Sequence, residues 1–599
     1  MAADYEYIVV GSGAGGGPLA ANLAKSGCRV LLLEAGSDPE TYLYQVPCFH
    51  AYSTEEKAMA WDFFVHHYSK DEERDTKYRP ERGGVFYPRA GTLGGCTAHN
   101  AMITVYPHDS DWDGIAELTG DDSWRAGNMR QYFQRLENCT YADVSEASKN
   151  GHGFDGWLKT SIVDPKLAIG DLQIIETVTD AAFRGGWWEV IKRIFSRRKL
   201  HFDPNDKRNA GVEGLTSRIP LATANGKRNG TREYIRAVQK AHPDRLTVRM
   251  NTLVTRVVFE DDRAVGVECL EGEHLYQADP NSGNATPARK TEYRCTREVI
   301  LAGGAFNTPQ LLMLSGIGPK AHLEEVGIDC RVDRPGVGRN LQDRYEVGIV
   351  SRTKREFALL RGATFKPPAD GELGDECFQE WLKGVGMYTS NGAVIALITR
   401  SKRSKTDPDL FMFALPGSFQ GYYPGYSADI ERSKTFLTWA ILKAHTNNTS
   451  GEVRLMSDDP RQRPYINFHY FDEGNDPDGD DLDAVVNAVM LVKQMNRDND
   501  SLAEEIVPGK RVKETREEIA KWVTDNAWGH HASCSCRMGK PDDPMAVVDS
   551  RFRVIGTKGL RIVDASVFPR IPGFFIVTPI YMISEKAADA ILEDREKPV

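Results

Sequence analysis

The feature that most constrains the fold is a glycine-rich turn near the start of the chain. An apolar run at 5–10 leads into Gly-Ser-Gly-Ala-Gly-Gly at 11–16, a helical segment follows up to Lys25, and a second apolar run ends at Glu34. A strand, tight turn, helix, strand and acidic residue in this order are typical of a dinucleotide-binding unit of about 30 residues. We therefore expect a dinucleotide here, although the unit alone leaves NAD, NADP and FAD open.

Each residue type in this unit has a physical reason. Gly11 permits the tight turn, and Gly13 lets backbone N–H groups approach a pyrophosphate at the helix N-terminus. Gly16 lets the helix pack closely on the strand. Glu34 can accept hydrogen bonds from a ribose 2′-OH.

Length and composition describe a globular protein of more than one domain. The chain has 599 residues, which is too long for one core, with 41% hydrophobic and 27% charged residues. With 75 Lys and Arg against 85 Asp and Glu, the net charge is −10. This balance does not favour nucleic acid as a partner.

The compartment follows from the first strand and the cysteines. The strand begins by Tyr5 and leaves no room for a signal peptide, so we expect a cytoplasmic protein. The longest apolar run, 573–583, is too short to span a bilayer and is interrupted by Pro579. We expect the ten cysteines to be mostly buried thiols. Cys534 and Cys536 lack the second pair that a zinc site needs, so we expect no metal.

Two further segments have unusual composition. Residues 89–100 are too rich in glycine for a helix interior and too apolar for a solvated linker, which suits close backbone approach to a flat ligand. From Trp187 to Lys199, basic residues alternate with aromatic ones. This pattern is compatible with a solvated helix face or with a patch on a membrane surface.

The later segments alternate between strands and turns. Alternating β-branched residues at 246–269 predict a small antiparallel sheet, the polar stretch 271–291 predicts an exposed hairpin loop, and 298–304 predicts a buried strand. Residues 345–525 carry strands and polar turns, as expected of a substrate domain. Residues 560–564 predict a last strand, and Thr578 as cap with Pro579 in the first turn predicts a helix through Leu592.

Four ordered motifs resemble one family. Residues 304–318, Gly-Ala-Phe-Asn-Thr-Pro-Gln-Leu-Leu-Met-Leu-Ser-Gly-Ile-Gly, match the second signature of the glucose-methanol-choline (GMC) flavoprotein oxidoreductases at every defined position. The stretches 335–343 and 560–566 and the amino-terminal glycine turn are also similar to this family. The resemblance covers most of the chain.

The resemblance implies a cofactor and a fold. The dinucleotide is expected to be FAD. The fold class is expected to be α/β, with a Rossmann-like FAD-binding domain of discontinuous segments, residues 1–155, 220–335 and 525–599. Residues 156–219 and 336–524 are expected to form an α+β substrate-binding domain, an antiparallel sheet with helices.

The resemblance also implies the cofactor-binding residues. By position they are Gly11, Gly13, Ala14, Gly15, Glu34, Gly91, Gly95, His99, Asn100, Val254, Asp564 and Thr578. Val254 is expected beside the adenine and Asp564 near the ribityl chain or pyrophosphate. The N-terminus of the last helix is expected to stabilise negative charge on the reduced flavin.

The first family signature is matched imperfectly and suggests a covalent link. Many members have two serines where Cys96 and Thr97 stand, and an aliphatic residue where His99 stands. Choline oxidases are similar to this chain at that point, and their histidine is joined to the flavin 8α-methyl group. We hypothesise a covalent FAD on His99. The alternative is a histidine that only packs or hydrogen-bonds near the ring.

Alcohol oxidation needs a base, and histidine suits this role because it can accept and return a proton near neutral pH. The family motif, aligned on Cys536-Arg537-Met538-Gly539, identifies His531 as this base. His530 is the competitor. In an extended segment the two side chains would face opposite ways, so we expect only one of them to face the flavin.

The chain departs from the family at Phe575. Most members have a histidine or asparagine four residues before the proline of the last helix, and phenylalanine can neither accept a proton nor donate a hydrogen bond. Either His531 works alone, or Thr578 or Asn526 replaces the partner. The expected substrate pocket consists of Trp528, His530, Phe574 and Phe575. Its apolar character favours an aromatic or long-chain primary alcohol.

The resulting functional hypothesis is the FAD-dependent oxidation of a primary alcohol to the aldehyde, with hydride transfer to flavin N5 and oxygen or another electron acceptor. The sequence does not distinguish an oxidase from a dehydrogenase. The alternative is a non-redox flavin enzyme on the same scaffold, resembling a hydroxynitrile lyase or a light-driven fatty acid decarboxylase. The missing polar partner at Phe575 keeps this alternative open.

Overall fold

The computed structural model describes residues 5–163 and 202–596, except for the single positions 370, 403, 405, 433 and 498. The segment from Trp187 to Lys199, predicted to be a helix face or a membrane patch, lies outside the described residues.

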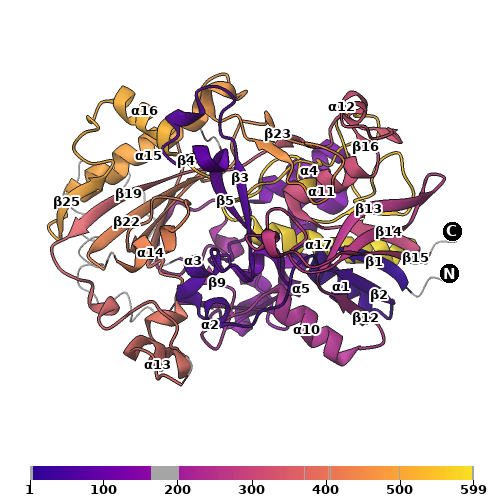
Figure 1. The fold of residues 1–599 in the computed structure, drawn as a ribbon. Helices are drawn as coiled ribbons and strands as arrows, with labels where there is room; N and C mark the ends of the chain where they lie inside the picture. The colour runs from indigo at the N-terminus through magenta and orange to yellow at the C-terminus, as the bar shows by residue number, and fades with distance from the viewer. Residues whose placement is uncertain are drawn as a thin grey trace.

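A parallel sheet forms the dinucleotide-binding end of the molecule (Figure 1). Its strands run in the order β12 (Leu246–Arg249), β2 (Val30–Leu33), β1 (Tyr5–Val10), β15 (Arg289–Leu301) and β26 (Leu560–Ile562). Residues 7–10 of β1, all of β2 and the last three residues of β15 are continuous runs of apolar residues, since both faces of a parallel sheet are covered. Helix α1 (Gly16–Lys25) packs against α10 (Thr231–Ala241) and α17 (Val577–Arg595).

Strand β15 belongs to two sheets at once. Its last residues pair in parallel with β1 and β26, whereas its first residues pair antiparallel with β14 (Arg263–Glu271), which in turn pairs with β13 (Thr252–Glu260). The antiparallel sheet predicted at 246–269 is therefore correct for β13 and β14, but β12 lies in the parallel sheet. The loop between β14 and β15 is not wholly exposed, because Tyr276 and Ala278 are buried.

An antiparallel sheet of six strands forms the other half of the molecule (Figure 1). Its order is β25 (Leu502–Val507), β19 (Tyr345–Thr353), β22 (Phe436–Lys443), β21 (Leu410–Pro416), β20 (Ile395–Thr399) and β8 (Gly214–Thr216). Helix α15 (Asp480–Arg497) packs on β19 and β22, and α16 (Arg516–Asn526) packs on α15. The predicted fold class is confirmed, while the domain boundaries stay a prediction.

Smaller elements connect the two halves. The short sheets comprise β3 (Ala60–Val65), β5 (Gly84–Ala90) and β4 (Tyr78–Arg79); β6 (Glu137–Cys139), β7 (Leu158–Ile162) and β9 (Pro220–Leu221); β18 (Arg339–Leu341), β23 (Gly451–Arg454) and β24 (Tyr465–Asn467); β10 (Thr223–Ala224) and β11 (Lys227–Arg228); and β16 (Ile317–Gly318) and β17 (Val332–Asp333). The other α-helices described are α2 (Tyr42–Gln45), α3 (His50–Ser53), α4 (Asp109–Thr119), α5 (Ala126–Leu136), α6 (Ala147–Asn150), α11 (Gly304–Leu314), α12 (Lys320–Glu325), α13 (Glu376–Leu382) and α14 (Tyr426–Glu431).

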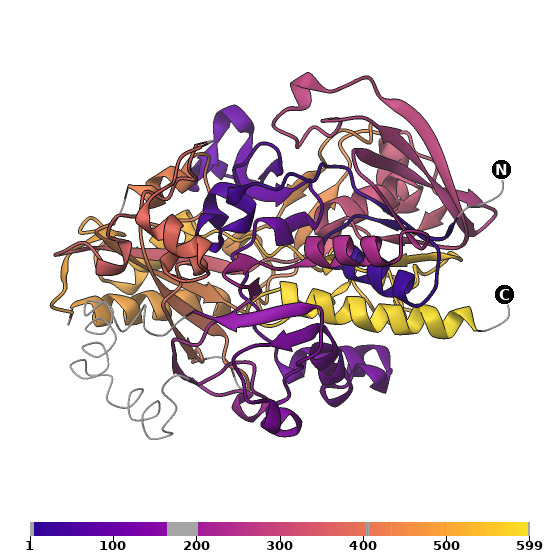
Figure 2. The same cartoon turned by 90° about the horizontal axis from the view of Figure 1, so that it is seen from below.

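The last helix starts slightly earlier than predicted. Ile576 caps α17, so Thr578 lies within the first turn and is not the cap. Pro579 is also in the first turn, where its missing N–H costs no helical hydrogen bond. Figure 2 shows α17 running lengthwise from the middle of the molecule to its outer end.

Two predictions about composition can be compared with the structure. All ten cysteines are free thiols, and seven of them are buried, as expected. Among the described residues, no helix combines the length and apolar character needed to cross a membrane.

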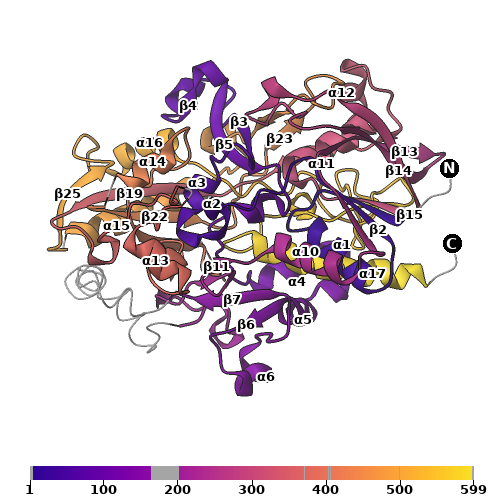
Figure 3. The same cartoon turned by 60° about the horizontal axis from the view of Figure 1, so that its bottom comes forward.

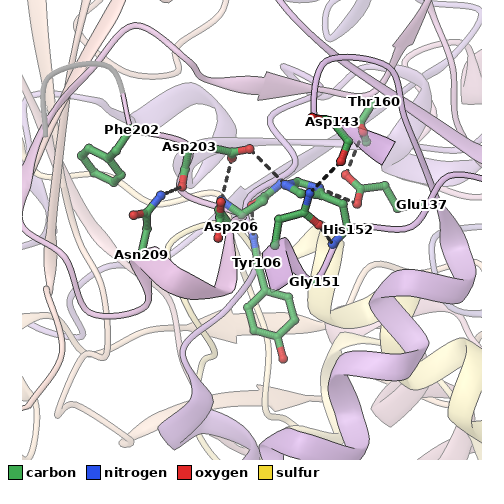
Figure 4. Close-up of polar contacts among 12 residues, drawn as sticks. Tyr106, Glu137, Asp143, Gly151, His152, Thr160, Phe202, Asp203, Asp206 and Asn209 are labelled. Atoms are coloured by element: carbon green, nitrogen blue, oxygen red, sulfur yellow. Dashed lines mark hydrogen bonds and ion pairs between the residues drawn. The ribbon is translucent and has the colours of Figure 1, made fainter. Parts of the chain in front are cut away.

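A buried charged network lies in the region below α17, where β6 and β7 lie beside α5 (Figure 3). The His152 ring lies between two carboxylates, with Nδ1 2.8 Å from Glu137 Oε2 and Nε2 3.0 Å from Asp203 Oδ2 (Figure 4). Thr160 Oγ1 donates to the other oxygen of Glu137. Burial alone would lower the pKa of His152, but hydrogen bonds with Asp203, Cys139 and Glu137 outweigh it and raise the pKa to about 12.

We expect His152→Gln to lower the free energy of unfolding by about 3–5 kcal/mol, because the two carboxylates lose their buried cation. Since the folded pKa lies above the ordinary 6.5, the wild-type contribution is complete below pH 6.5 and declines as the pH rises toward 12. Urea unfolding at several pH values checks this. His274→Gln, which removes a more exposed histidine paired with Asp279, should cost less than about 1 kcal/mol. Equal losses in the two variants would contradict the prediction.

Candidate active site

One cavity reaches from the glycine turn to the histidine pair. The predicted site residues that line it are Gly11, Gly13, Ala14, Gly15, Glu34, Gly95, His99, Asn100, Val254, Asp564, His530, His531 and Phe575. Four others, Gly91, Trp528, Phe574 and Thr578, are not among its lining residues. The fold thus brings residues from both ends of the sequence to one site.

The turn after β1 is packed too tightly for side chains. A Cβ on Gly15 would lie 1.9 Å from the carbonyl oxygen of Val563, which follows β26. A Cβ on Gly95 would lie 2.9 Å from Cα of Gly13, so the glycine segment at 89–100 touches the glycine turn directly. These contacts leave backbone lining the cavity at the N-terminus of α1, which favours a negatively charged group.

Glu34 lies at the end of β2 with its carboxylate buried. Its Oε2 accepts hydrogen bonds from the backbone N–H and the hydroxyl of Ser12, and its Oε1 accepts from the N–H of Gly36. Val254 on β13 lines the same part of the cavity. Asp564 accepts from Gly304 N–H and Thr308 Oγ1, which ties β26 to the start of α11.

His99 lies in a charged corner of the cavity. Its side chain is buried, and Nδ1 has no hydrogen-bond partner among the described residues. Cys96 is close by, with Arg89 Nη1 3.5 Å from its sulfur. Burial alone would raise the pKa of the Cys96 thiol, but the charge of Arg89 and the proximity of His99 outweigh it and lower the pKa to about 6.

His530 and His531 lie side by side, and the expectation that they face opposite ways is wrong. Their ring centroids are 4.0 Å apart, and both side chains line the cavity. The reason is a bulge. Gln342 pairs with Ser533 and Glu346 pairs with Trp528, so five residue steps on one segment oppose four on the other. The extra residue breaks the alternation of a regular strand.

The backbone of this bulge is held by a buried carboxyl group. Asp343 Oδ1 accepts a hydrogen bond of 2.8 Å from the N–H of His531, and its Oδ2 accepts one of 2.5 Å from the hydroxyl of Tyr87. The same Tyr87 hydroxyl accepts from the N–H of Ala532, and Arg89 Nη2 donates to the carbonyl of His530. The histidine positions are therefore fixed through their main chain.

Glu346 faces both histidines from β19. Its Oε1 lies 3.3 Å from Nδ1 of His530 and 3.7 Å from Nδ1 of His531. Burial, followed by the charge of Asp343, raises the pKa of Glu346 well above its usual value. Burial and the positive charge of Arg89 lower the pKa of His530 to about 3, while burial and His530 lower that of His531 well below 6.5. Both histidines are therefore neutral at neutral pH, and the raised pKa of Glu346 favours its protonated form.

The other predicted pocket residues have different neighbours. Phe575 lines the cavity with its ring 6.0 Å from that of His531, edge to face. Phe574 packs behind it on His108 and Phe411. Trp528 packs on Phe419 outside the cavity. Among the described residues, neither suggested replacement for the polar partner lines the cavity: Asn526 bonds to Thr76 and Trp522, and Thr578 lies within α17.

Sequence reasoning missed several residues that line the cavity. They are Glu346, Tyr276, Phe419, Tyr422 and Tyr426. Glu346 lies three residues after the motif at 335–343, and its position in an otherwise apolar strand was a usable signal. Tyr276 lies in the loop expected to be exposed, and the two aromatic residues at 422 and 426 stand in a polar turn without a motif.

The cavity fits a large bound group. The closely packed turn leaves only backbone at one end, and Nδ1 of His99, His530 and His531 are buried without hydrogen-bond partners within the described part of the chain. Buried polar atoms are rarely left unpaired in native proteins, so a bound group and substrate are expected to supply partners. The absence of a metal stays a prediction, because Glu346, His530 and His531 could also be ligands of one.

Comparison with known proteins identifies the family of this chain. The two family models described as GMC oxidoreductase match residues 5–346 and 447–584. The chain belongs to the GMC oxidoreductase family. An oxygen-dependent choline dehydrogenase of Staphylococcus aureus is 32% identical over 597 residues, 98% of this chain and 93% of the relative. The predicted enzyme class, an FAD-dependent GMC oxidoreductase acting on CH–OH groups, is confirmed.

Solved structures share the fold. A formate oxidase of Aspergillus oryzae has a TM-score of 0.80 at 23% identity and covers 99% of this chain and 98% of its own. A fungal aryl-alcohol oxidase has a TM-score of 0.71 at 19% identity, with both chains covered in full at 100%. At these identities the likeness concerns the fold alone.

We expect Gly15→Ala to lose most of its bound flavin and to be about 1–3 kcal/mol less stable, because the added methyl group meets the Val563 carbonyl and the turn must move. Visible absorbance of the purified protein and thermal unfolding measure both effects. Gly114→Ala is the matched control, since no atom lies within 4 Å of a Cβ at this position in α4. A Gly15→Ala protein with full flavin content would contradict this prediction.

Proposed function

We propose that the protein binds FAD along the cavity and oxidises an aromatic or long-chain primary alcohol to the aldehyde, with His531 as the base. The observation that carries this proposal is a pair of histidines on the wall of the cavity that the glycine turn also lines, with Phe575 beside His531. The family of the chain supports the reaction class.

The lining residues suggest how FAD would be held. Gly11 to Gly15 would hold the pyrophosphate, Glu34 the ribose and Val254 the adenine. The first turn of α17 also lines the cavity, and the positive end of its dipole would stabilise negative charge on the flavin. Bound FAD supplies the acceptor for the hydride.

His531 has the properties of a base in this reaction. A base must be unprotonated to act, and the lowered pKa of His531 keeps it so throughout the neutral range. Its Nδ1 faces Glu346, which leaves Nε2 for a substrate hydroxyl. The proton of the hydroxyl would pass to Nε2 while the backbone N–H bond to Asp343 holds the residue in place.

The walls next to the histidines favour an apolar substrate. They consist largely of aromatic and aliphatic side chains: Phe413, Leu415, Phe419, Tyr422, Tyr426, Phe575 and Ile576. Burial of an aromatic or alkyl chain against such walls gives about 25 cal/mol per Å² of apolar surface. The choice of oxygen or another electron acceptor and the cytoplasmic location stay predictions.

Anaerobic mixing of the flavoprotein with a panel of alcohols tests the proposal. We expect benzylic and long-chain primary alcohols to bleach the flavin, and hydrogen peroxide yield compared with reduction of a dye then distinguishes an oxidase from a dehydrogenase. A high kcat/KM for choline or glucose with none for these alcohols would overturn the substrate class. Turnover without bleaching indicates a lyase, and turnover only under blue light indicates a photoenzyme.

We expect His531→Ala to slow flavin reduction about 10²- to 10⁴-fold, the usual contribution of a positioned base. His530→Ala should have a smaller effect, because its ring is not the group we assign to the substrate proton. Stopped-flow flavin reduction under anaerobic conditions measures both variants. The assignment of the base fails if His530→Ala is the more damaged of the two.

The burial of the unpartnered Nδ1 of His99, near Cys96 and Arg89, supports the proposal of a covalent link from His99 to FAD. After acid precipitation we expect the yellow colour to stay with the protein pellet, and His99→Ala should release it to the supernatant. Colour left entirely in the wild-type supernatant would show that the flavin is not covalently attached.

A further inference from the structure

The Glu346 carboxyl group lies between His530 and His531, and the side chain of Trp528 is also close to it. Oε1 is buried and makes no hydrogen bond within the described residues that meets strict geometry, although Nδ1 of His530 is 3.3 Å away and Nδ1 of His531 is 3.7 Å away. Catalytic hydrogen bonds are often long in structures without substrate and shorten in the complex. Oε1 of Glu346 and the two Nδ1 atoms are therefore placed so that hydrogen bonds between them can form in the complex with substrate.

The positive charges around these three groups explain why a carboxyl group is needed between the two histidines. Arg344 is fully buried, donates through Nη2 to the carbonyl of Pro572, and has no partner at Nε or Nη1 among the described residues. Arg89 lies on the other side, hydrogen-bonded to the carbonyl of His530. A proton taken up by His531 adds a third positive charge to a buried site, which is costly without a negative partner.

Only one of the nearby acids is placed to become that partner. Asp343 already accepts from the Tyr87 hydroxyl, from its neighbour Arg344 N–H and from His531 N–H, so both of its oxygens are engaged. The side chain of Phe575, whose ring is 6.0 Å from that of His531, offers no polar atom. Burial raises the pKa of Glu346, and its Oε1 lies within 4 Å of Nδ1 of both rings. Its ionisation would place a carboxylate beside the new imidazolium.

We propose that Glu346 and His530 form a proton relay that replaces the polar partner missing at Phe575. The inference rests on the proposed function of His531. Glu346 Oε1 carries a proton that it donates to Nδ1 of His530, and the same oxygen accepts from the Nδ1–H of His531. This arrangement fixes His531 in the tautomer whose Nε2 is free to accept.

The relay consists of two successive proton transfers. When the substrate O–H bond breaks, its electron pair stays on oxygen and its proton forms a bond with Nε2 of His531. The O–H bond of Glu346 then breaks, and that proton bonds to Nδ1 of His530. At this point His531 and His530 are both imidazolium rings with the Glu346 carboxylate between them, and loss of the Nε2 proton of His530 leaves one imidazolium, on His531, beside the carboxylate. His530, whose side chain is 27% exposed against 10% for His531, passes its proton to solvent.

A double-variant cycle tests the relay. We expect Glu346→Gln and His530→Asn each to slow flavin reduction about 10- to 100-fold, the range for losing a hydrogen bond to a charged group. The double variant should be no slower than Glu346→Gln alone, because both residues serve one relay. Glu346→Asp should restore part of the rate. Multiplied effects in the double variant would overturn the proposal.

A spectroscopic readout separates this proposal from the proposed function. In the wild-type flavoprotein labelled with ¹⁵N-histidine, we expect two neutral rings with opposite tautomers, His531 protonated at Nδ1 and His530 at Nε2. Glu346→Gln should change this pattern, whereas Ser351→Ala, a buried polar residue on the same strand, should not. Identical tautomers in the wild type contradict the relay. If no alcohol reduces the flavin, the proposed function fails, and the spectra still decide the arrangement of the three groups.

Discussion

The hydrogen bonds of the Asp343 carboxyl group are the interaction on which the rest of the site depends. They join the strand that carries Tyr87, the start of β19 and the bulged segment at 530–532, three parts that lie far apart in the sequence. A buried carboxylate tolerates its loss of water only when such bonds replace it. The geometry of the two histidines is therefore set by a main-chain anchor, and their rings stay free for chemistry.

The segment that carries Phe575 is held in a similar way. Arg344 donates to the carbonyl of Pro572, and Asp111 accepts from the N–H of Gly573. Asp111 is itself bound to His445, on the side of the segment that faces away from the cavity. The buried guanidinium thus has two roles, because it fixes this wall and its charge adds to the burial that lowers the pKa of the neighbouring histidines.

Much of the fold could be predicted because its signals are local. The glycine turn, the apolar runs of the parallel sheet and Glu34 each follow from a few adjacent residues, and the motif at 304–318 identified the family. The geometry of the site could not be predicted from such local signals. The bulge at 530–531 arises from unequal numbers of residues between two pairs of partners, and no local pattern contains that count. Trp528 was expected in the pocket because of its chemistry, but it packs behind the wall on Phe419. Thr578 has a side chain suited to a helix N-cap, but the helix begins earlier and Ile576 is its N-cap. This start is compatible with Pro579, because proline is tolerated in the first turn of a helix.

The position of β15 has a consequence for the order in which the molecule can form. This strand pairs with β1 from the start of the chain and with β26 from its end, and α1 packs against α17. The glycine turn is therefore completed by residues that the ribosome makes much later, since Gly15 rests on the backbone of Val563. Long-range pairing of this kind slows folding. The nascent chain can close its cofactor cavity only after Val563 has been made, so the cavity forms late relative to the synthesis of its own glycine turn.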